Sequence, residues 1–511
     1  MFPLSKIHLP PSEKLAVARF VRKSDDVSRS APTRRDTITF DVDVPISLSD
    51  VVTIADGARV QVTDAVLHAV ADAASAADAI ASATPAYGRS TGVGANRETS
   101  VTDASDHGIR LIRSHATDAG DDLPARTVRA LIATRLAQLA RAGSGIDPAI
   151  LPALVDALDR DDVAEIGAVG SIGTADLAAL AALGLTLAGE RSAGSPVEPV
   201  RWGVESALPF LSSSALTIGR AILASAELRR LDRGGRIVFA LTSAALRANP
   251  SALSDAAAAA AAAPHVEEVG AEIRGLLDGA SWSPARIQDP FGFRVYPITQ
   301  GALLTSLERL DAQLLRLLNA AQENPVFDVE AGIVTHHGAF FQAQLALDLD
   351  ATNLAIAQSA TNAHALLRLT NEPAFTGLAP FLATGPAGAS GLMMLEYTAA
   401  AALAEIRNAA TPASLGTIVL SRGTEEDASF ATQGAVQLER AVASYRIVLA
   451  CELIAVSRLL AQLDVEVPAP LTRAAAGIRA LQPHQEDQDL RGPLQAAADL
   501  LDTLHETDLV P

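Results

Sequence analysis

Long runs of Ala, Leu and Ile are the feature that most constrains the fold of this chain. They recur near residues 124–142, 148–190, 206–232, 300–321, 340–370, 390–410 and 429–463. In several runs the apolar residues fall at i, i+3, i+4 and i+7, which places them on one face of a helix. Apolar residues make up 49% of the chain but aromatic residues only 4%, so we expect helices packed through small side chains. The sequence therefore predicts a mainly α protein with a bundle of long helices.

Pattern and composition divide the chain into four regions. They are a flexible leader (1–36), a small α+β N-terminal region (37–200), the central long-helix bundle (201–465) and a C-terminal helical segment (466–511). The leader is polar and charged with weak periodicity. In the second region, alternation over Thr37–Val44 predicts a strand, and Leu48 begins a helix. In the third region, Asp255, eight alanines and Pro264 predict a capped helix that the proline ends.

Net charge and cysteine content exclude several classes of partner. Forty Lys and Arg against 59 Asp and Glu leave a charge of −19, which repels nucleic acids and anionic membranes. The apolar stretch from Thr174 to Gly189 is short and contains Asp176, so we interpret it as a buried helix. Cys451 is expected as a buried thiol. With no apolar export signal in Met1–Lys14, these features indicate the cytoplasm.

Gly- and Pro-rich breaks interrupt the helices, and such loops often carry functional groups. They lie near residues 85–96, 167–173, 288–301 and 415–427. The first reads Ala86-Tyr-Gly-Arg-Ser-Thr-Gly-Val-Gly94, whose glycines permit unusual backbone angles beside Tyr87. Ser114-His115-Ala116 follows, and then Arg135 precedes the turn Gly143-Ser-Gly-Ile146.

Further motifs follow in a fixed order. They are Gly167-Ala-Val-Gly-Ser-Ile-Gly-Thr-Ala-Asp-Leu-Ala178, Gln288-Asp-Pro-Phe-Gly-Phe-Arg294, Glu323-Asn-Pro325, Gly338-Ala-Phe340, Ala404-Glu405 and Thr424-Glu-Glu-Asp427. With the preceding ones, they resemble the histidine/phenylalanine ammonia-lyase superfamily in register over about residues 40 to 430. The resemblance implies a mostly helical homotetramer whose active sites combine loops from three subunits.

One departure from the family concerns its prosthetic group. In the family an Ala-Ser-Gly tripeptide cyclises to a methylidene-imidazolone, an electrophile that activates the substrate. Aligned through Asp176, the triplet here is Gly173-Thr174-Ala175, or Thr174-Ala175 with one residue deleted. Aligned through Gly167 to Gly173, it is Ser171-Ile172-Gly173. Neither alignment puts Ser before Gly, so we predict that the group is absent and that no other cofactor replaces it.

Other polar positions of the family pattern have changed as well. Phe291 stands where the family has a tyrosine, and Ser212 stands where it has an asparagine. The segment Ala339-Phe340-Phe341 replaces an Asn-Phe-His sequence. By resemblance these residues surround the prosthetic group or the amine, and Ser212, Phe291 and Phe340 are expected to line the substrate site. Their joint replacement agrees with loss of the prosthetic group.

Four family positions are retained, and the resemblance implies their roles. Tyr87 would be the acid or base at the substrate β-carbon, which requires neighbours that lower its pKa if it is a base; the alternative is a structural tyrosine. His115 would assist orientation or proton movement, or would simply be packed. Arg294 would bind a carboxylate through its planar fork, or form an intersubunit salt bridge. Glu405 favours a cationic or NH-bearing head group.

The remaining histidine pair does not indicate a metal site. His336 and His337 are adjacent and have no suitably spaced carboxylates, so we predict no metal.

We interpret the chain as a lyase that works on a small-molecule substrate without the prosthetic group. It would eliminate a good leaving group, such as the quaternary ammonium of a histidine-type betaine like ergothioneine, from the α-carbon of an amino-acid-derived carboxylate. Two alternatives stay open. One is a different elimination, addition, cyclisation or isomerisation in specialised metabolism, which the apolar Phe291, Ala339 and Phe341 favour. The other is a non-catalytic scaffold.

Overall fold

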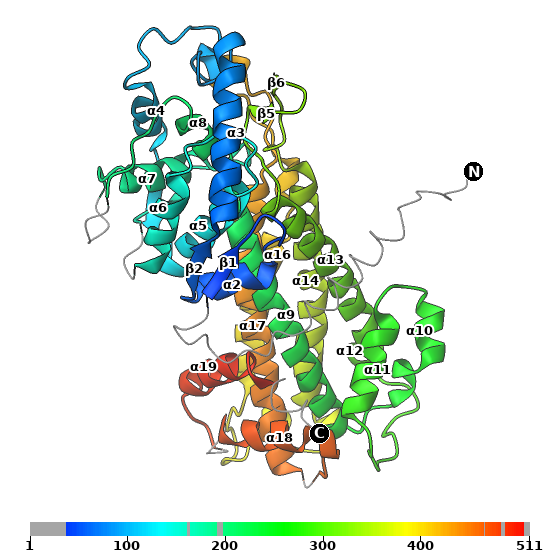
Figure 1. Cartoon of the computed structure of the whole chain (residues 1–511). Coiled ribbons are helices and arrows are strands. Elements are labelled where there is room, and N and C mark those ends of the chain that lie inside the picture. Colours follow the sequence, from blue (N-terminus) through cyan, green and yellow to red (C-terminus); the bar gives the residue numbers. More distant parts are fainter. Residues whose placement is uncertain (1–36, 161–163, 192–197, 464, 482–485, 505–511) are drawn as a thin grey trace.

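The structure is a computed structural model that describes residues 37–160, 164–191, 198–463, 465–481 and 486–504. The predicted leader lies outside the described residues. Figure 1 shows a long helical bundle with a smaller helical region above it. The helices are α2 Leu48–Ala55, α3 Asp64–Ala83, α4 His107–His115, α5 Ala125–Leu139, α6 Ile150–Asp159, α7 Leu177–Leu187, α8 Ala207–Leu211, α9 Ala215–Ala245, α10 Asp255–Ala261, α11 Val266–Leu276, α12 Phe291–Arg294, α13 Tyr296–Leu318, α14 Ala343–Thr370, α15 Pro373–Thr376, α16 Met393–Ala409, α17 Ala431–Gln462, α18 Thr472–Ile478 and α19 Arg491–Leu500.

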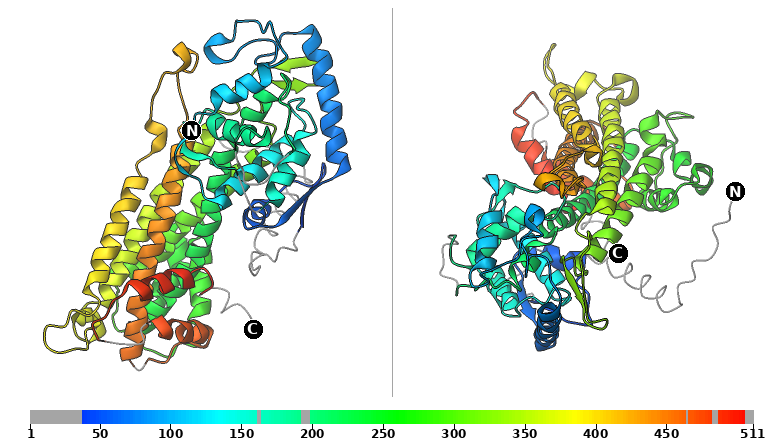
Figure 2. Two further views of the ribbon diagram at one scale, coloured as in Figure 1. Left: turned by 90° about the vertical axis from the view of Figure 1, so that its left-hand side faces the viewer. Right: turned by 90° about the horizontal axis from the view of Figure 1, so that it is seen from above.

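Five of these helices form the bundle, and α17 is at its centre. Helix α17 contacts α9, α14 and α16, while α13 contacts both α14 and α9. The long helices run side by side along the bundle (Figure 2). Their facing surfaces are rich in buried Ala and Leu, so the backbones pack closely and the apolar area removed from water stabilises the bundle. The predicted mainly α class is confirmed.

The smaller region contains α2 to α8 and short strands. Strand β1 (Thr37–Phe40) pairs in parallel with β2 (Arg59–Val62), β3 (Ala119–Asp122) pairs antiparallel with β4 (Gly167–Val169), and β5 (Val326–Asp328) pairs antiparallel with β6 (Ile333–Thr335). The region is joined to the bundle where α5 packs on α9. It carries the Tyr87 loop and the segment before α7 at one end of the bundle.

Several predicted boundaries need correction. Strand β1 ends at Phe40 rather than Val44, because its partner offers only four residues for pairing. Helix α7 begins at Leu177 rather than Thr174. The predicted break at 288–301 is too long, because α13 already begins at Tyr296 and accommodates a proline in its first turn.

Two other local predictions are confirmed. The helix start at Leu48 carries a full capping box, in which Ser47 and Asp50 satisfy each other's backbone N–H groups. The alanine run forms the predicted helix, α10, but its N-cap is Ser254 rather than Asp255, and it ends at Ala262 in a left-handed conformation before it reaches Pro264.

Apolar segments that could be mistaken for membrane spans lie in the protein core. Among the described residues, the stretch 207–245 alone is long and apolar enough to cross a membrane, and its most apolar window is wholly buried. Helix α7 is also buried, as predicted for this stretch. Cys451 is inaccessible, and burial raises its pKa to about 12, which confirms a buried thiol.

A buried carboxyl in α17 makes the stability of the bundle depend on pH. Burial raises the pKa of Glu452 to about 8, although a hydrogen bond from the Thr242 hydroxyl at 3.2 Å opposes the rise. Above the ordinary glutamate pKa of about 4.3 the unfolded chain has lost this proton, whereas the folded chain keeps it up to about 8. Between these values the free energy of unfolding therefore falls as pH rises, by up to ~1.4 kcal/mol per pH unit.

The Glu452→Gln variant removes this titration while it keeps the size of the side chain. We expect its urea midpoint to change less than that of the wild type between about pH 5 and 8, and the variant to be the more stable protein at the upper end. Urea unfolding curves across this range provide the measurement. If the urea midpoints of the two proteins changed with pH in parallel, Glu452 would not titrate in this way.

Candidate functional site

The segment Gly173–Asp176 forms a tight turn between β4 and α7. Gly173 and Ala175 both have left-handed backbones, with φ of 84° and 76°. A Cβ at Gly173 would lie 2.3 Å from Ser429 Oγ, so only glycine fits there. Two hydroxyls hold the turn, because Ser429 donates to the Gly173 carbonyl at 2.8 Å and Ser171 donates to the Ala175 carbonyl at 3.1 Å.

The carboxylate of Asp176 ties this turn to two bundle helices. It accepts hydrogen bonds from the Thr217 backbone N–H at 2.8 Å and from the Thr217 hydroxyl at 2.9 Å, both at the start of α9. Thr432 of α17 lies 3.5 Å away. The Asp176 N–H also donates to the Ser213 carbonyl at 2.7 Å. Asp176 is fully buried, and this burial raises its pKa in spite of these hydrogen bonds.

The three serines between α8 and α9 connect the turn to other predicted site residues. Ser212 donates to the Asn324 carbonyl at 3.5 Å, and Ser214 donates to the Phe340 carbonyl at 3.3 Å. Ser213, whose carbonyl holds Asp176, donates to Gln138 at 2.5 Å. The Ser212–Ser214 segment therefore links the Gly173–Asp176 turn to Phe340, while the predicted role of Ser212 and Phe340 in lining a substrate site stays a prediction.

A buried ion pair lies beneath these serines. Arg135 pairs with Glu323 at 3.0 Å, and both side chains are fully buried. The same guanidinium donates to the carbonyls of Phe210 and Pro209 in α8. Burial raises the pKa of Glu323, while the charge of Arg135 opposes the rise. Both residues belong to sequence motifs, but the sequence does not predict that they pair, because 188 positions separate them.

Tyr87 lies in a loop that packs on α8. At Gly88 a Cβ would come within 2.1 Å of Leu208, so the loop requires glycine there. The Tyr87 hydroxyl accepts a hydrogen bond from the Gly94 N–H at 2.6 Å, and the Tyr87 N–H donates to His336 Nε2 at 3.2 Å. The loop thus packs on α8, the helix whose carbonyls also accept hydrogen bonds from Arg135.

The environment of Tyr87 favours its protonated form. Burial raises its pKa most, the Gly94 N–H opposes the rise, nearby Glu425 raises the pKa further, and Arg97 lowers it. A base at this position would require a lowered pKa, so the chain alone holds the phenol as a proton donor. The Gly94 N–H is nevertheless the donor that would stabilise a phenolate.

The acidic segment 424–427 reaches the Tyr87 loop. Ser421 accepts from the Ala95 N–H at 3.0 Å, and Arg97 donates to Thr424 at 2.8 Å. These contacts place Glu425 close enough to affect the pKa of Tyr87. The sequence identified this segment only as a motif, without this contact.

The ring of His115 is held by a hydrogen bond. Its Nδ1 lies 2.8 Å from the Leu111 carbonyl, which can only accept, so Nδ1 donates this hydrogen bond. The ring ends α4, which packs against α7 and α8. Among the described residues, no hydrogen bond joins His115 to Tyr87. The Nδ1 side of the ring has a structural role, because it bonds to the Leu111 carbonyl.

Arg294 and Phe291 lie far from Tyr87 within one chain. They belong to α12, low on the bundle, whereas the loop after α3 is at its upper end (Figure 1). Arg294 Nε donates to the Asp289 carbonyl at 2.7 Å. With the Gln288 amide oxygen turned toward it, Nη1 and Nη2 donate at 2.5 and 3.1 Å. The Phe291 ring, 67% exposed, lies 4.5 Å from the guanidinium carbon.

Glu405 is exposed on α16, and among the described residues no hydrogen bond or ion pair joins it to Tyr87. The described residues contain no group of three or more His, Cys, Asp or Glu that could hold a metal ion. His336 accepts from Tyr87 and His337 Nδ1 accepts from the Ala339 N–H at 3.0 Å, which gives both rings a structural role.

Comparison with known proteins agrees with this arrangement. The model of the family "Aromatic amino acid lyase" matches residues 46–480. The chain belongs to this family. It is 30% identical over 490 residues to histidine ammonia-lyase of Symbiobacterium thermophilum, covering 91% of this chain and 96% of the relative. It is also 30% identical to histidine ammonia-lyase of Streptomyces coelicolor over 485 residues, covering 88% and 94%. Membership of the aromatic amino acid lyase family indicates a carbon–nitrogen lyase.

Solved structures share the fold of this aromatic amino acid lyase. Ergothionase from Treponema denticola, described as an ergothioneine-degrading enzyme, has a TM-score of 0.85 with 21% identity, covering 93% of this chain and all of that one. Histidine ammonia-lyase from Trypanosoma cruzi has a TM-score of 0.85 with 22% identity, covering 92% and 94%. At this level of identity the likeness concerns the fold.

The hydrogen bonds of Asp176 should dominate the stability of the site. In an Asp176→Ala variant the Thr217 N–H and hydroxyl lose their acceptor in a buried place, which costs about 3 kcal/mol or more. We expect a clear fall in melting temperature. The control is Asp72→Ala, which changes an exposed aspartate of α3 and should cost less than about 0.5 kcal/mol. Equal effects of the two substitutions would contradict the role assigned to Asp176.

Proposed function

We propose that this protein is a lyase that works without a methylidene-imidazolone. It would eliminate a good leaving group from the α-carbon of an amino-acid-derived carboxylate, with Tyr87 transferring the β-proton. The observation that carries the proposal is the composition and packing of the Gly173–Asp176 turn. Four other positions of the family pattern are retained, namely Tyr87, His115, Arg294 and Glu405.

The turn does not fit the prosthetic group of the ammonia-lyases. Cyclisation requires a middle residue that loses water and a third residue whose nitrogen attacks the first carbonyl. In one register the middle residue is Ile172, which cannot dehydrate. In the other the third residue is Ala175, whose side chain is buried in a left-handed turn, and the Gly173 carbonyl is held by Ser429. No step of the proposed reaction passes through such a group.

Without that electrophile, the substrate must carry its own leaving group. A quaternary ammonium leaves as a neutral tertiary amine, whereas free ammonia is a poor leaving group. The negative charge of Glu425, which acts on Tyr87, suits a cationic substrate. The fold shared with an ergothioneine-degrading enzyme supports a betaine as the substrate class.

A cationic substrate would also change the protonation of Tyr87. A positive charge bound near the phenol lowers its pKa, and the Gly94 N–H at 2.6 Å stabilises the phenolate. The β C–H proton then passes to the phenolate oxygen. The electrons of that bond form the carbon–carbon double bond, and the C–N electron pair leaves with the amine.

Self-association would complete the site. Arg294, which we propose as the carboxylate-binding residue, is distant from Tyr87 in one chain, so a neighbouring subunit must supply it. Exposed apolar side chains on α14 and α16 need a partner of this kind. They are Leu347, Leu354, Met394 and Tyr397, each 48–63% exposed. We therefore propose a homotetramer, which light scattering on the purified protein would test.

A different reaction in the same pocket is the second candidate. The guanidinium of Arg294 is already engaged by Gln288 and Asp289 and is stacked on Phe291. A substrate carboxylate would have to displace the Gln288 amide to bind in a bidentate manner. A substrate without a carboxylate would require no such displacement, and this favours another elimination, addition, cyclisation or isomerisation.

A substrate panel tests the first candidate. The protein is incubated with histidine, phenylalanine and tyrosine and with their trimethylated betaines, and conjugated-acid absorbance and released amine are followed. We expect turnover of at least one betaine and none of the free amino acids. Activity on free amino acids would contradict the proposal, and no activity on any betaine would favour the second candidate.

Tyr87→Phe should lower kcat by about 10²–10⁴-fold, because it removes the proton-transferring group. The matched control is Tyr397→Phe, which removes only a hydroxyl, keeps the aromatic ring that we assign to the subunit interface, and should leave kcat unchanged. Steady-state kinetics with the active betaine give both values. A Tyr87→Phe enzyme with wild-type kcat would exclude the phenol from the reaction.

Glu425 raises the pKa of Tyr87 through its charge. Because the base must be deprotonated, the rate rises as pH passes through the titration of the phenol. Glu425→Gln should therefore move the rising limb of kcat/KM to lower pH, while Glu330→Gln, which changes an exposed glutamate, should not. A shift to higher pH, or none, would contradict this electrostatic coupling.

A further inference from the structure

A cavity lies at the end of the bundle opposite the Tyr87 loop. Its volume is about 430 Å³, and it is lined by Arg368, Asn371, Glu372, Pro373, Pro380, Phe381 and Glu396. Helix α14 starts just after Phe340 and ends beside this cavity at Thr370. At 1.5 Å per residue its 28 residues separate the two places by about 40 Å. The volume falls within the range of small-molecule pockets.

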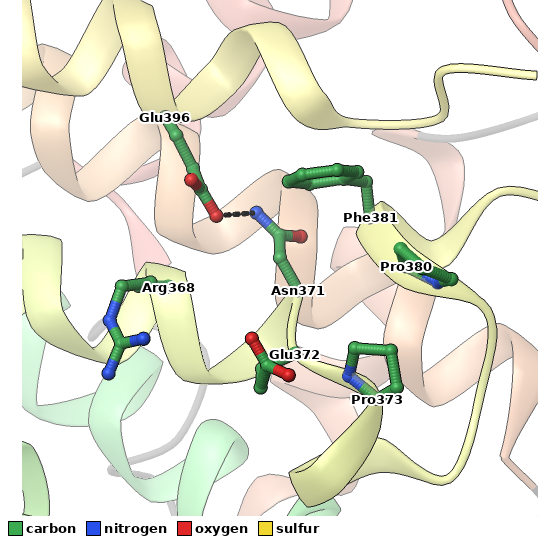
Figure 3. Close-up of a pocket in the computed structure, with 7 residues that line it drawn as sticks. All are labelled: Arg368, Asn371, Glu372, Pro373, Pro380, Phe381 and Glu396. Carbon is green, nitrogen blue, oxygen red and sulfur yellow. Dashed lines mark hydrogen bonds between the residues drawn. The ribbon is translucent and has the colours of Figure 1, made fainter.

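Asn371 presents an unpaired acceptor to this cavity. The residue is only 3% exposed, and its Nδ2 donates to Glu396 at 3.1 Å. Its Oδ1 is buried without a hydrogen-bond partner among the described residues. Figure 3 shows this oxygen directed toward the space between Phe381 and Pro380. Buried acceptors are rarely left unpaired, so a ligand with a donor group is expected here.

The walls around Asn371 are held in place. The Phe381 N–H donates to the Asn371 carbonyl at 3.0 Å, and the Leu392 N–H donates to the Phe381 carbonyl at 2.8 Å. The cavity therefore lies between fixed backbone segments, the C-terminus of α14 and the start of α16 (Figure 3). A preformed pocket binds a ligand without the entropy cost of ordering its walls.

Charges of both signs line the cavity without neutralising each other. Glu372 and Glu396 contribute carboxylates. Figure 3 shows the guanidinium of Arg368 at the opposite side of the cavity from Phe381. The ring of Phe381 and two prolines form the side of the cavity away from Arg368, and the two carboxylates lie between (Figure 3). One end of the cavity thus favours a cation and the other an anion.

We propose that this cavity binds a free α-amino acid as a zwitterion. The ammonium group would donate to Glu396, Glu372 and Asn371 Oδ1, and would lie beside the face of Phe381. The carboxylate would pair with Arg368, and an apolar side chain would contact Pro373 and Pro380. The site is separate from the Tyr87 cluster, and the inference does not depend on the reaction proposed above.

Calorimetric titration of the full-length protein with L-leucine tests the proposal. Two analogues each lack one charge: isoamylamine has no carboxylate, and 4-methylpentanoate has no ammonium. We expect saturable binding of L-leucine and affinities about tenfold or more weaker for each analogue, because each loses a charge-assisted interaction. If isoamylamine bound as tightly as L-leucine, the cavity would recognise an amine rather than a zwitterion, and the proposal would be overturned.

Variants locate the binding. Arg368→Gln should weaken L-leucine binding about tenfold but leave that of isoamylamine unchanged, and Glu396→Gln should weaken both. Arg316→Gln, which changes a surface arginine of α13 bonded to Gln313, is the matched control. Tyr87→Phe should retain L-leucine binding, which distinguishes this cavity from the candidate active site. No saturable binding of L-leucine, or unaltered affinity in Arg368→Gln, would overturn the proposal.

Discussion

The buried carboxylate of Asp176 is the interaction on which the candidate site depends. It joins the turn before α7 to Thr217 of α9 and lies beside Thr432 of α17, so three helices meet at one side chain. A buried carboxylate is tolerated only when it is hydrogen-bonded. The position of the turn is therefore fixed by the packing of the bundle, and the same constraint fixes Ser213, whose carbonyl accepts from Asp176.

Two other parts of the candidate site contact α8, namely the Arg135–Glu323 pair and the Tyr87 loop. The buried pair of Arg135 and Glu323 supports the serines of the α8–α9 junction from below, and the Tyr87 loop packs on α8. The residue proposed to transfer the proton, Tyr87, thus lies in the loop that packs on α8, whereas the residue proposed to bind the carboxylate, Arg294, belongs to α12. A complete site of the proposed kind requires more than one chain.

The sequence predicts the fold well because its information is local and periodic. Long apolar repeats define α9, α14 and α17, and a capping box defines α2. The grouping of Ser212, Phe340 and the degenerate turn follows from motif order. The sequence does not show which distant residues contact each other, such as Asp176 and Thr217. Nor does it show the effects of burial, such as the raised pKa of Tyr87 and the unpaired oxygen of Asn371. The predicted strand end at Val44 was wrong for the same reason, because the length of the strand is set by its partner.

The central claim is that a turn of this composition and packing remains an ordinary peptide while the protein keeps a lyase site. Mass spectrometry of the intact protein, followed by mapping of the peptide that contains Gly173–Asp176, tests it most directly. Cyclisation to a methylidene-imidazolone removes water from the chain. We predict the mass of the unmodified sequence for both the protein and this peptide. A peptide lighter by the mass of water would contradict the account.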